Sequence, residues 1–344
     1  MLYVLPREAC LKPGDVYEMA KIAFLEYLTS GITACFDMYY SAPESAKAAE
    51  EMGMRIVLVG TYNKEFDTLE KLTNVYRSFN DKNGLVRYCY GVHAEYTLGE
   101  GELEHIVEAC HALKAPMFTH ICETEKEVKE CIEKRGMTPV AYFEKMGAFD
   151  YGGGGYHCCY FSDEDIEIFK RHNCFVVTCP GSNTKLASGI APICKYLQKG
   201  LKVAIGTDGP ASNNSLDMFK EMTLTYALQK VSLKDPTALP AFELLKMATV
   251  NGARAMGLND SDVLEVGKKA DLIEIDLSRP NMQPLNNIVN NIVYSGSKEN
   301  IKMTMINGKI LYRDGKFFTK EKPSTIYKRC QKIAERIEKE LLGQ

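Results

Sequence analysis

Two apolar runs in this sequence end on side chains that could bind and use a metal ion. The run "APMFTHICETEKEV" (115–128) contains His120 and Glu123, and the run "KVAIGTDGP" (202–210) contains Asp208. An imidazole can hold a metal while a carboxylate three residues later faces the molecule that the metal activates. A carboxylate at the end of a strand is equally explained as a turn or helix cap. Each run alone therefore leaves both explanations open.

Three further apolar runs end in the same way, with His93 in "GVHAEY", His157 in "GGYHCC" and Cys179 in "VVTCPG". An isolated buried histidine most often only satisfies a hydrogen bond, so none of these endings predicts a site by itself. Three such endings, at His120, His157 and Asp208, do predict a site if they converge on one barrel mouth. The other histidines lie inside helical patterns and receive no role; they are His105, His111 and His172.

The elements that must position these residues alternate along the chain. Short β-branched or aromatic runs are separated by helical patterns, which is typical of consecutive βαβ units in a parallel sheet. The seven predicted strands are 31–40, 55–62, 86–96, 116–124, 154–161, 174–182 and 202–210. The helical patterns include 16–31, which stops at Gly31, and 162–172, where Ser162 and Asp165 have the spacing of a capping box.

Parallel strands separated by single helices form either an open doubly wound sheet or a closed eight-stranded barrel. The polar endings favour the barrel, because a (βα)8 barrel builds its site from the C-terminal ends of several strands. A doubly wound nucleotide-binding sheet would show a glycine fingerprint after its first strand. The glycines at 152–155 precede a strand and open no helix, so we interpret them as a tight turn and not as a phosphate cradle.

The pattern changes after about residue 260, where we expect a β-rich appendage. The runs "ADLIEIDL", "NIVYSG" and "KMTMINGKILYRDGKFF" follow one another with no helical pattern between them. Asn307 and Gly308 predict a type I′ hairpin, because both positions of that turn need a positive φ. The amphipathic stretch 326–342 predicts a terminal helix that packs against the rest of the chain.

The composition is that of an ordinary soluble chain and excludes some partners. The 344 residues carry a net charge of −3 and no window rich in Lys or Arg, so no nucleic acid partner is expected. The longest apolar stretches have about 5 to 8 residues, too few to cross a membrane, and no signal segment follows Met1. The twelve cysteines are scattered without a Cys-x-x-Cys pair, which favours reduced, mostly buried thiols. We therefore expect a cytoplasmic protein.

Six longer motifs resemble those of a known family. They are "FTHICETEKEV", "YHCCYFSDEDI", "NTKLASGIAPI", "GTDGPASNNSLDMF", "MATVNGARAMGL" and "VGKKADLIEID". Together they resemble the amidohydrolase superfamily, and within it most closely the 5′-methylthioadenosine/S-adenosylhomocysteine deaminases and the related chlorohydrolases. The resemblance covers nearly the whole chain.

The resemblance implies a set of metal ligands and catalytic groups. His120 and Asp208 would be ligands of one divalent metal, usually zinc, with one ion expected per chain. Glu123 would shuttle a proton to the purine ring nitrogen, and His157, alongside Asp208, would orient or deprotonate the metal-bound water. The run 86–96 contains no lysine, so a carbamate that bridges two metals has no evident source.

On the substrate side, the resemblance implies contacts from Glu8, His93 and Glu123. His93 matches a substrate-side histidine, and Glu8 in "LPREACL" matches a glutamate that contacts ribose hydroxyls. The implied reaction is hydrolytic deamination of S-adenosylhomocysteine, 5′-methylthioadenosine or adenosine to the inosine counterpart, with release of ammonia. The alternatives are an enzyme that removes halide or amine from another N-heterocycle and a non-catalytic binding protein with a degenerate site.

One motif of the resembling family is absent from this chain. Its members carry His-x-His, two of the metal ligands, on the first barrel strand, after several strands of a small β-sandwich; no His-x-His occurs here. A zinc site takes about four ligands, so we expect doubtful zinc occupancy and impaired deamination in the isolated chain. A wrong start, a split gene, a second polypeptide and a decayed, inactive remnant all remain open as explanations.

The sequence thus predicts an α/β fold in two parts. Residues 1–258 would form a TIM-like (βα) barrel that lacks its first strand, and residues 259–344 would form a partial C-terminal β-sandwich segment with the terminal helix. Seven strands leave two unpaired edges, which favour a homo-oligomer or a complementing N-terminal segment. The expected small-molecule partner is an aminopurine nucleoside, with neither a nucleic acid nor a membrane as a further partner.

Overall fold

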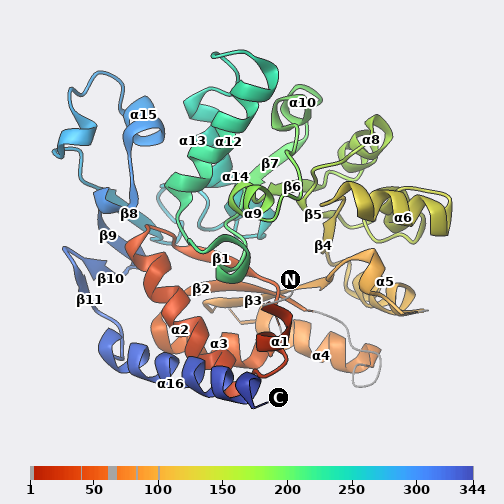
Figure 1. Ribbon diagram of the computed structural model, residues 1–344, viewed down its shortest axis with the longest axis horizontal. Coiled ribbons are helices and arrows are strands. Elements are labelled where there is room, and N and C mark those ends of the chain that lie inside the picture. Colours follow the sequence, from red (N-terminus) through yellow and green to blue (C-terminus); the bar gives the residue numbers. More distant parts are fainter. Residues whose placement is uncertain (1–3, 40, 61–67, 83, 100, 344) are drawn as a thin grey trace.

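Seven parallel strands form one sheet that curls into a half-barrel, with helices on its outer side (Figure 1). This computed structural model describes residues 4–39, 41–60, 68–82, 84–99 and 101–343. The strands are β1 (Ala34–Asp37), β2 (Arg55–Gly60), β3 (Val86–Val92), β4 (Met117–Ile121), β5 (Gly153–His157), β6 (Phe175–Thr178) and β7 (Lys202–Ile205). They lie side by side in chain order, and within the described ranges no strand joins β1 to β7. The predicted fold class is confirmed; residues 61–62 of the predicted strand 55–62 lie outside the described residues.

Helices follow most of the strands, as the alternating pattern predicts. Those of the barrel part are α1 (Val4–Glu8), α2 (Pro13–Thr29), α3 (Ala42–Met52), α4 (Leu69–Asn80), η1 (Glu95–Thr97), α5 (Glu102–Leu113), α6 (Glu125–Arg135), α7 (Pro139–Lys145), α8 (Asp163–Arg171), α9 (Pro180–Lys185), α10 (Ile193–Gln198), α11 (Pro210–Asn213), α12 (Met218–Leu233), α13 (Ala241–Ala248) and α14 (Val250–Ala255). The predicted helices 16–31 and 162–172 are confirmed as α2 and α8. The hydroxyl of Ser162 accepts the N–H of Asp165 at 3.1 Å, and the Asp165 carboxylate accepts the N–H of Ser162 at 2.8 Å, which confirms the capping box.

The predicted strands other than 55–62 extend too far at their C-terminal ends, as the last two illustrate. The predicted strand 174–182 ends at Thr178, and α9 begins at Pro180. Proline suits the first position of a helix, because it lacks an N–H that would be unpaired there and its φ is already helical. Pro210 begins α11 in the same way, inside the predicted strand 202–210.

The glycines at 152–155 were interpreted as a tight turn, and this is wrong for three of the four. The last three lie inside β5. A Cβ atom on Gly153 would be 1.9 Å from the carbonyl oxygen of Met117, and one on Gly154 would be 2.3 Å from that of Phe175. These glycines therefore allow the neighbouring strands to approach β5 closely.

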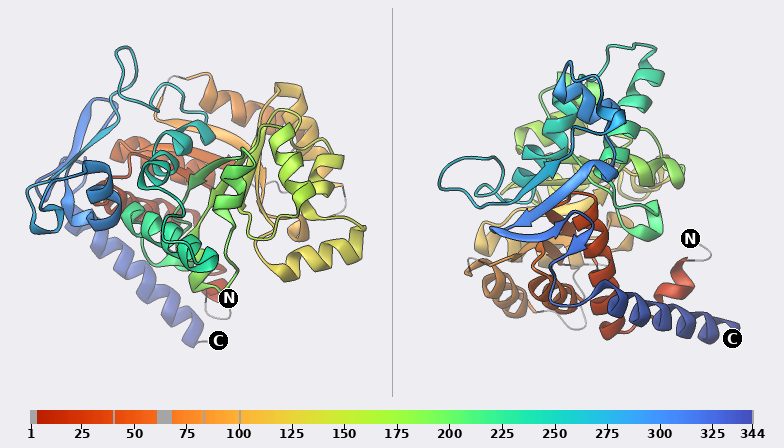
Figure 2. Two further views of the ribbon diagram at one scale, coloured as in Figure 1. Left: turned by 90° about the horizontal axis from the view of Figure 1, so that it is seen from above. Right: turned by 90° about the vertical axis from the view of Figure 1, so that its left-hand side faces the viewer.

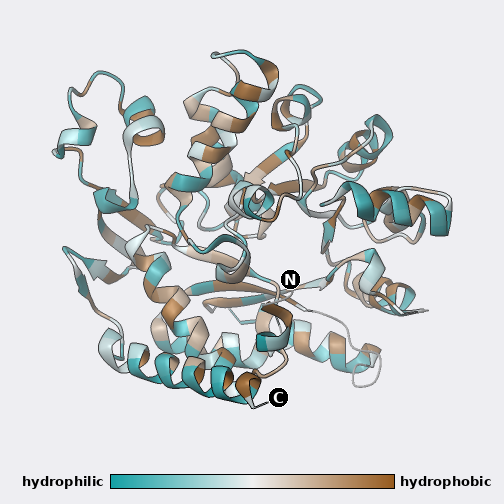
Figure 3. Cartoon of the chain, viewed as in Figure 1, coloured by the Kyte–Doolittle hydropathy of each residue, from teal (hydrophilic) through white to brown (hydrophobic). Residues whose placement is uncertain are grey.

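Both faces of the parallel sheet are buried, as is usual for parallel strands covered by helices. The inside of the half-barrel is filled by Val57, Val59, Cys89, Phe118, Tyr156, Val177, Ala204, Ala255 and Leu258. The ring of Phe36 on β1 lies edge-on to Phe118 on β4, with centroids 4.8 Å apart, which shows how far the sheet curls. Figure 3 shows apolar residues on the strands and polar residues on the outer sides of the helices.

The C-terminal segment forms an antiparallel sheet at one side of the half-barrel (Figure 2). Its strands are β8 (Leu272–Ile275), β9 (Ile301–Ile306), β10 (Lys309–Arg313) and β11 (Lys316–Phe317), in the order β11-β10-β9-β8, and α16 (Pro323–Leu342) follows them. Asn307 and Gly308 have φ angles of 50° and 75° between β9 and β10, so the predicted hairpin is confirmed, as is the terminal helix.

The expectation of β structure throughout this segment is wrong around "NIVYSG". The first five of these residues form η3 (Asn291–Ser295), directly after α15 (Ile288–Asn290), and the short turns η2 (Pro280–Met282) and η4 (Lys298–Asn300) flank the two. The Asn287 side chain accepts the N–H of Asn290 at 3.0 Å and so begins the helical turn. The Asn291 side chain donates to the carbonyl of Met282 at 2.8 Å. Local side-chain hydrogen bonds thus outweigh the β propensity of the run.

The C-terminal segment packs against α2. The hydroxyl of Thr304 on β9 donates to the carbonyl of Leu28 at 2.7 Å, and α16 runs along the outer side of α2 (Figure 1). Arg55, at the start of β2, forms a buried ion pair with Asp271. The division of the chain at residue 258 stays a prediction.

The twelve cysteines are all free thiols, and ten of them are buried. Among the described helices, none combines the length and the apolar character that crossing a membrane requires.

Candidate active site

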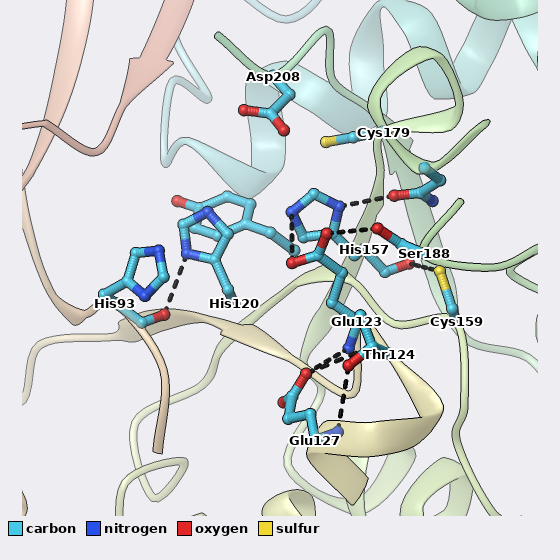
Figure 4. A network of polar contacts seen from close by, with 12 residues as sticks. His93, His120, Glu123, Thr124, Glu127, His157, Cys159, Cys179, Ser188 and Asp208 are labelled. Atoms are coloured by element: carbon cyan, nitrogen blue, oxygen red, sulfur yellow. Dashed lines mark hydrogen bonds and ion pairs between the residues drawn. The ribbon is translucent and has the colours of Figure 1, made fainter. Parts of the chain in front are cut away.

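The C-terminal ends of β3, β4 and β5 bring three histidines into one row (Figure 4). The imidazole centroids of His93 and His120 are 4.6 Å apart, and those of His120 and His157 are 5.3 Å apart, with the rings stacked in both pairs. These distances match the ~4.8 Å spacing of neighbouring strands. The register of the parallel strands therefore places these three histidines side by side.

The main chain at the end of β3 fixes the ring of His120. The carbonyl oxygen of His93 accepts the N–H of His120 at 2.8 Å and lies 3.0 Å from its Nδ1. Because a carbonyl only accepts, Nδ1 carries the proton and Nε2 keeps a free lone pair. Burial, with the nearby His157 and His93, holds the pKa of His120 well below its usual value. A neutral imidazole with a free Nε2 is the form that binds metals.

Side chains on both sides of the ring contact the two nitrogens of His157. Its Nδ1 lies 2.7 Å from the side-chain oxygen of Asn183, and its Nε2 lies 3.9 Å from Oε2 of Glu123. The residue has a φ of 68°, and Cys122 and Asp208, also after strand ends, have φ angles of 51° and 58°. Left-handed conformations at residues other than glycine cost on the order of 1 kcal/mol or more and cluster at functional sites. At these three strand ends, the backbone turns away from the sheet.

Glu123 lies between two partners. Its Oε1 accepts the hydroxyl of Ser188 at 2.7 Å, and its Oε2 faces His157. Its main chain is fixed by Glu127, whose Oε2 accepts the N–H of Glu123 at 2.8 Å. The hydroxyl of Thr124 accepts the N–H of Glu127 at 3.1 Å and completes a capping box at the start of α6. The loop that carries Glu123 is therefore held at both its side chain and its backbone.

Asp208 follows β7 and reaches the same site from the other edge of the sheet. Its Oδ1 accepts the N–H of Gly209 at 2.5 Å, and the side chain remains partly exposed. Figure 4 shows its carboxylate near the imidazole of His157, with the thiol of Cys179 beside them. Burial raises the pKa of Cys179 well above its usual value, and the charge of Asp208 adds to this effect.

A buried carboxylate connects the loops after β6 and β7. Oε2 of Glu221 accepts the N–H of Gly181 at 2.8 Å, and its Oε1 accepts the side-chain amide of Asn213 at 2.8 Å. The same amide donates to the carbonyl of Thr207 at 2.7 Å. Burial raises the pKa of Glu221 to about 7. The loop that carries Asp208 and the start of α9 therefore share one anchor.

Glu8, the last residue of α1, lies close enough to His93 for its charge to act on that ring. Its Oε1 accepts the hydroxyl of Tyr39 at 2.8 Å. Burial lowers the pKa of His93, while the charges of Glu123, Asp208 and Glu8 act in the opposite direction. The structure thus brings all six predicted site residues to one region; their roles stay predictions.

The side chains at this site include types of metal ligand that zinc binds, but fewer of them than a zinc site needs. His120 offers a neutral Nε2 and Asp208 a carboxylate, and both are donors that zinc accepts. In the part of the chain that the structure describes, no group of three or more His, Cys, Asp or Glu side chains could hold a metal ion. The described residues therefore offer two donors of kinds that zinc accepts.

Sequence reasoning missed the partners of the predicted residues. Asn183 and Ser188 lie within the motif "NTKLASG", and Glu127 lies within "FTHICETEKEV", yet none of them was given a role. Nothing in the sequence around Glu221 indicates a role for its carboxylate. Asn183 is 26 residues from His157, and Ser188 is 65 residues from Glu123, so only the folded chain shows these contacts.

Comparisons with known proteins identify the class of this chain. Residues 3–311 match the amidohydrolase family, and the chain belongs to that family. It is 40% identical over 317 residues to a 5-methylthioadenosine/S-adenosylhomocysteine deaminase of Caldanaerobacter subterraneus subsp. tengcongensis, covering 90% of this chain and 73% of that protein. It is also 40% identical over 316 residues to a 5′-deoxyadenosine deaminase of Methanosarcina acetivorans, with 90% and 73% covered.

A solved structure agrees with the fold. An adenosine deaminase from Xanthomonas campestris with bound zinc superposes with a TM-score of 0.92 at 28% identity, covering 98% of this chain and 79% of that one. The atrazine chlorohydrolase TrzN of Arthrobacter aurescens superposes with a TM-score of 0.83 at 21% identity, covering 95% and 78%. The second likeness concerns the fold alone.

Proposed function

We propose that this chain deaminates an adenosine derivative by hydrolysis, giving the inosine counterpart and ammonia. The arrangement of Glu123 and His157 carries the proposal, because a carboxylate oxygen and a ring nitrogen 3.9 Å apart face one space beside His120. The names of the relatives at 40% identity support an adenosine-type substrate.

The proposal includes a zinc ion held by Nε2 of His120 and the carboxylate of Asp208, together with donors outside the described residues. A segment bearing His-x-His is the complement that we expect. Zinc, when bound, would lower the pKa of a water ligand to about 7, so that hydroxide would be available at neutral pH.

The residues of this chain move the protons of the reaction. Water adds to the purine carbon that bears the amine, and the first of its two protons passes to Nε2 of His157 or to Asp208. Glu123 takes the second proton from the added hydroxyl and delivers it to the neighbouring ring nitrogen. His157 or Asp208 then returns the first proton to the amine, the carbon–nitrogen bond breaks as the carbon–oxygen bond becomes a carbonyl, and ammonia leaves. Each step needs a group that can both accept and donate, as a carboxylate and a neutral imidazole can.

The substrate would be held by residues around this centre. His93 lies next to His120 in the row of imidazoles, and Glu8 carries a carboxylate suited to sugar hydroxyls. The free thiols of the chain favour a reducing compartment, and we propose the cytoplasm.

The test is an assay of the purified chain in the presence of zinc. The substrate is S-adenosylhomocysteine, 5′-methylthioadenosine, 5′-deoxyadenosine or adenosine. Loss of the adenine absorbance and release of ammonia report turnover. We expect turnover when a segment bearing His-x-His is supplied, and a loss of at least about 100-fold in Asp208→Ala. Turnover that survives Asp208→Ala contradicts the assignment.

Metal analysis separates this enzyme from a binding protein that keeps the fold. Near-stoichiometric zinc in the complemented chain, reduced in His120→Ala, supports the enzyme. A chain that binds the nucleoside but neither takes up zinc nor turns over supports the binding protein.

A further inference from the structure

Two of the groups proposed to move protons, His157 and Glu123, contact the same short segment. This segment, residues 180–188, comprises α9 and the turn behind it, and we call it the α9 segment. Within it, the Asn183 side chain contacts His157 at 2.7 Å and the Ser188 hydroxyl donates to Glu123 at 2.7 Å. Asn183 is 2% exposed and Ser188 is 5% exposed, so water does not compete readily for either contact.

The contact from Asn183 decides which nitrogen of His157 is available. A side-chain carbonyl oxygen accepts only, so it selects the tautomer with the proton on Nδ1. Nε2 then has its lone pair toward Glu123 and Asp208, where a proton acceptor is needed. Without the Asn183 oxygen, either tautomer is available to the ring.

The contact from Ser188 decides which oxygen of Glu123 faces His157. The hydroxyl donates to Oε1, and Oε2 is left 3.9 Å from Nε2 of His157. The N–H of Ser188 also donates to the carbonyl of Asn183 at 2.9 Å. The two contacts therefore belong to one hydrogen-bonded turn and are not independent.

The α9 segment is itself held in place by its surroundings. Its start is bonded to Glu221 through the N–H of Gly181, and a Cβ atom on Gly181 would lie 2.4 Å from the carboxylate of Glu221. Near its end, Nζ of Lys185 donates to the carbonyl of Ala211 in α11 at 2.8 Å. A segment fixed at both ends can orient the side chains that contact it.

We propose that Asn183 and Ser188 are positioning residues that set the tautomer of His157 and the orientation of Glu123. The proposal deepens the deaminase function and rests on it for its kinetic consequence. Through the α9 segment, the group that takes a proton from water and the group that gives one to the purine are held at a fixed separation.

The test uses the full chain with the zinc and the His-x-His segment that its assay requires. We expect Asn183→Ala to lower kcat by about 10- to 100-fold and Ser188→Ala by about 10-fold, with KM changed less than about threefold, because misplaced groups slow the chemistry more than binding. Asn183→Asp keeps an acceptor for Nδ1 and should retain more activity than Asn183→Ala. Thr184→Ala is the matched control, since its hydroxyl donates only to carbonyls of its own helix, at 2.8 and 3.1 Å.

A second measurement needs no turnover. The chain has six histidines, and ¹⁵N NMR of the labelled protein can assign the tautomer of His157. We expect a protected Nδ1–H in the wild type, in Thr184→Ala and in Asn183→Asp, and its loss in Asn183→Ala.

The two measurements separate the two proposals. If no adenosine derivative is deaminated but the NMR signal depends on Asn183, the proposed function fails and the positioning role of Asn183 stands. If deamination occurs, and neither the signal nor kcat differs between Asn183→Ala and Thr184→Ala, the positioning role is overturned and the function stands.

Discussion

Replacing Glu127 by alanine should destabilise the protein and loosen the loop that carries Glu123. Glu127 lies in the first turn of α6 and is 5% exposed. Its Oε1 accepts the N–H of Cys122 at 2.7 Å, and its Oε2 accepts those of Glu123 at 2.8 Å and Thr124 at 3.4 Å. Alanine would leave all three donors without this partner. Cys122 is fully buried, so water cannot replace the carboxylate at that position.

The expected loss of stability follows from the two short hydrogen bonds that Glu127 accepts. Hydrogen bonds to a charged group contribute roughly 1.5–3 kcal/mol each, and the bond at 3.4 Å adds little. Burial raises the pKa of Glu127, against the effect of these N–H donors, so part of the gain is offset by the cost of burying the charge. We therefore expect Glu127→Ala to lower the free energy of unfolding by about 2–4 kcal/mol, and Glu127→Gln, which keeps one acceptor, by about half as much.

Urea unfolding followed by circular dichroism measures this difference, and the same helix supplies the control. Glu125 is also in the first turn of α6, but it is exposed and forms a surface ion pair with Lys129 at 2.8 Å. Glu125→Ala should cost no more than about 0.5 kcal/mol, because surface pairs contribute little. Equal free energies of unfolding for Glu127→Ala and Glu125→Ala would refute the anchoring role of Glu127.

Two further changes test the sheet and the buried carboxylate. Gly154→Ala should lower the free energy of unfolding by at least about 1–3 kcal/mol, since its Cβ would lie 2.3 Å from the carbonyl oxygen of Phe175. Gly252→Ala in α14, with no atom nearer than 3.9 Å, should raise it by about 0.4–1 kcal/mol in the same denaturation experiment; equal effects would argue against the close packing of β5. Burial raises the pKa of Glu221 from 4.5 to about 7. Between these values the unfolded chain releases a proton that the folded chain keeps, so the contribution of Glu221 to stability falls as the pH rises. The free energy of unfolding of Glu221→Gln, relative to that of the wild type, should therefore rise by up to about 3 kcal/mol between about pH 4.5 and pH 8. If the free energies of unfolding of the two proteins change in parallel with pH, the raised pKa is contradicted.

The sequence predicted the strands and the residues at their ends because both depend on local patterns. Each strand is a short apolar run, and parallel strands in chain order place the C-terminal ends of all runs at one edge of the sheet. His93, His120 and His157 therefore came together without any knowledge of side-chain contacts. The hairpin at Asn307 was equally local, since two residues with positive φ define it.

The errors arose where nonlocal contacts or nearby side chains outweighed the pattern. The glycines of β5 have the sequence pattern of a turn, but they lie in a strand because the carbonyl oxygens of Met117 and Phe175, from or beside two other strands, leave no space for side chains there. The helical turn around Asn291 depends on side-chain hydrogen bonds that β propensity does not include.

The sequence by itself determined the class of fold and which imidazoles and carboxylates lie at one end of the sheet. Only the tertiary structure decided how these groups are oriented, because their partners come from distant parts of the chain: Asn183 for His157, Ser188 for Glu123, and the His93 carbonyl for His120. A tautomer or a carboxylate rotamer is set by a hydrogen-bond partner at 2.7–3.0 Å, and such a partner is defined only when the chain has folded.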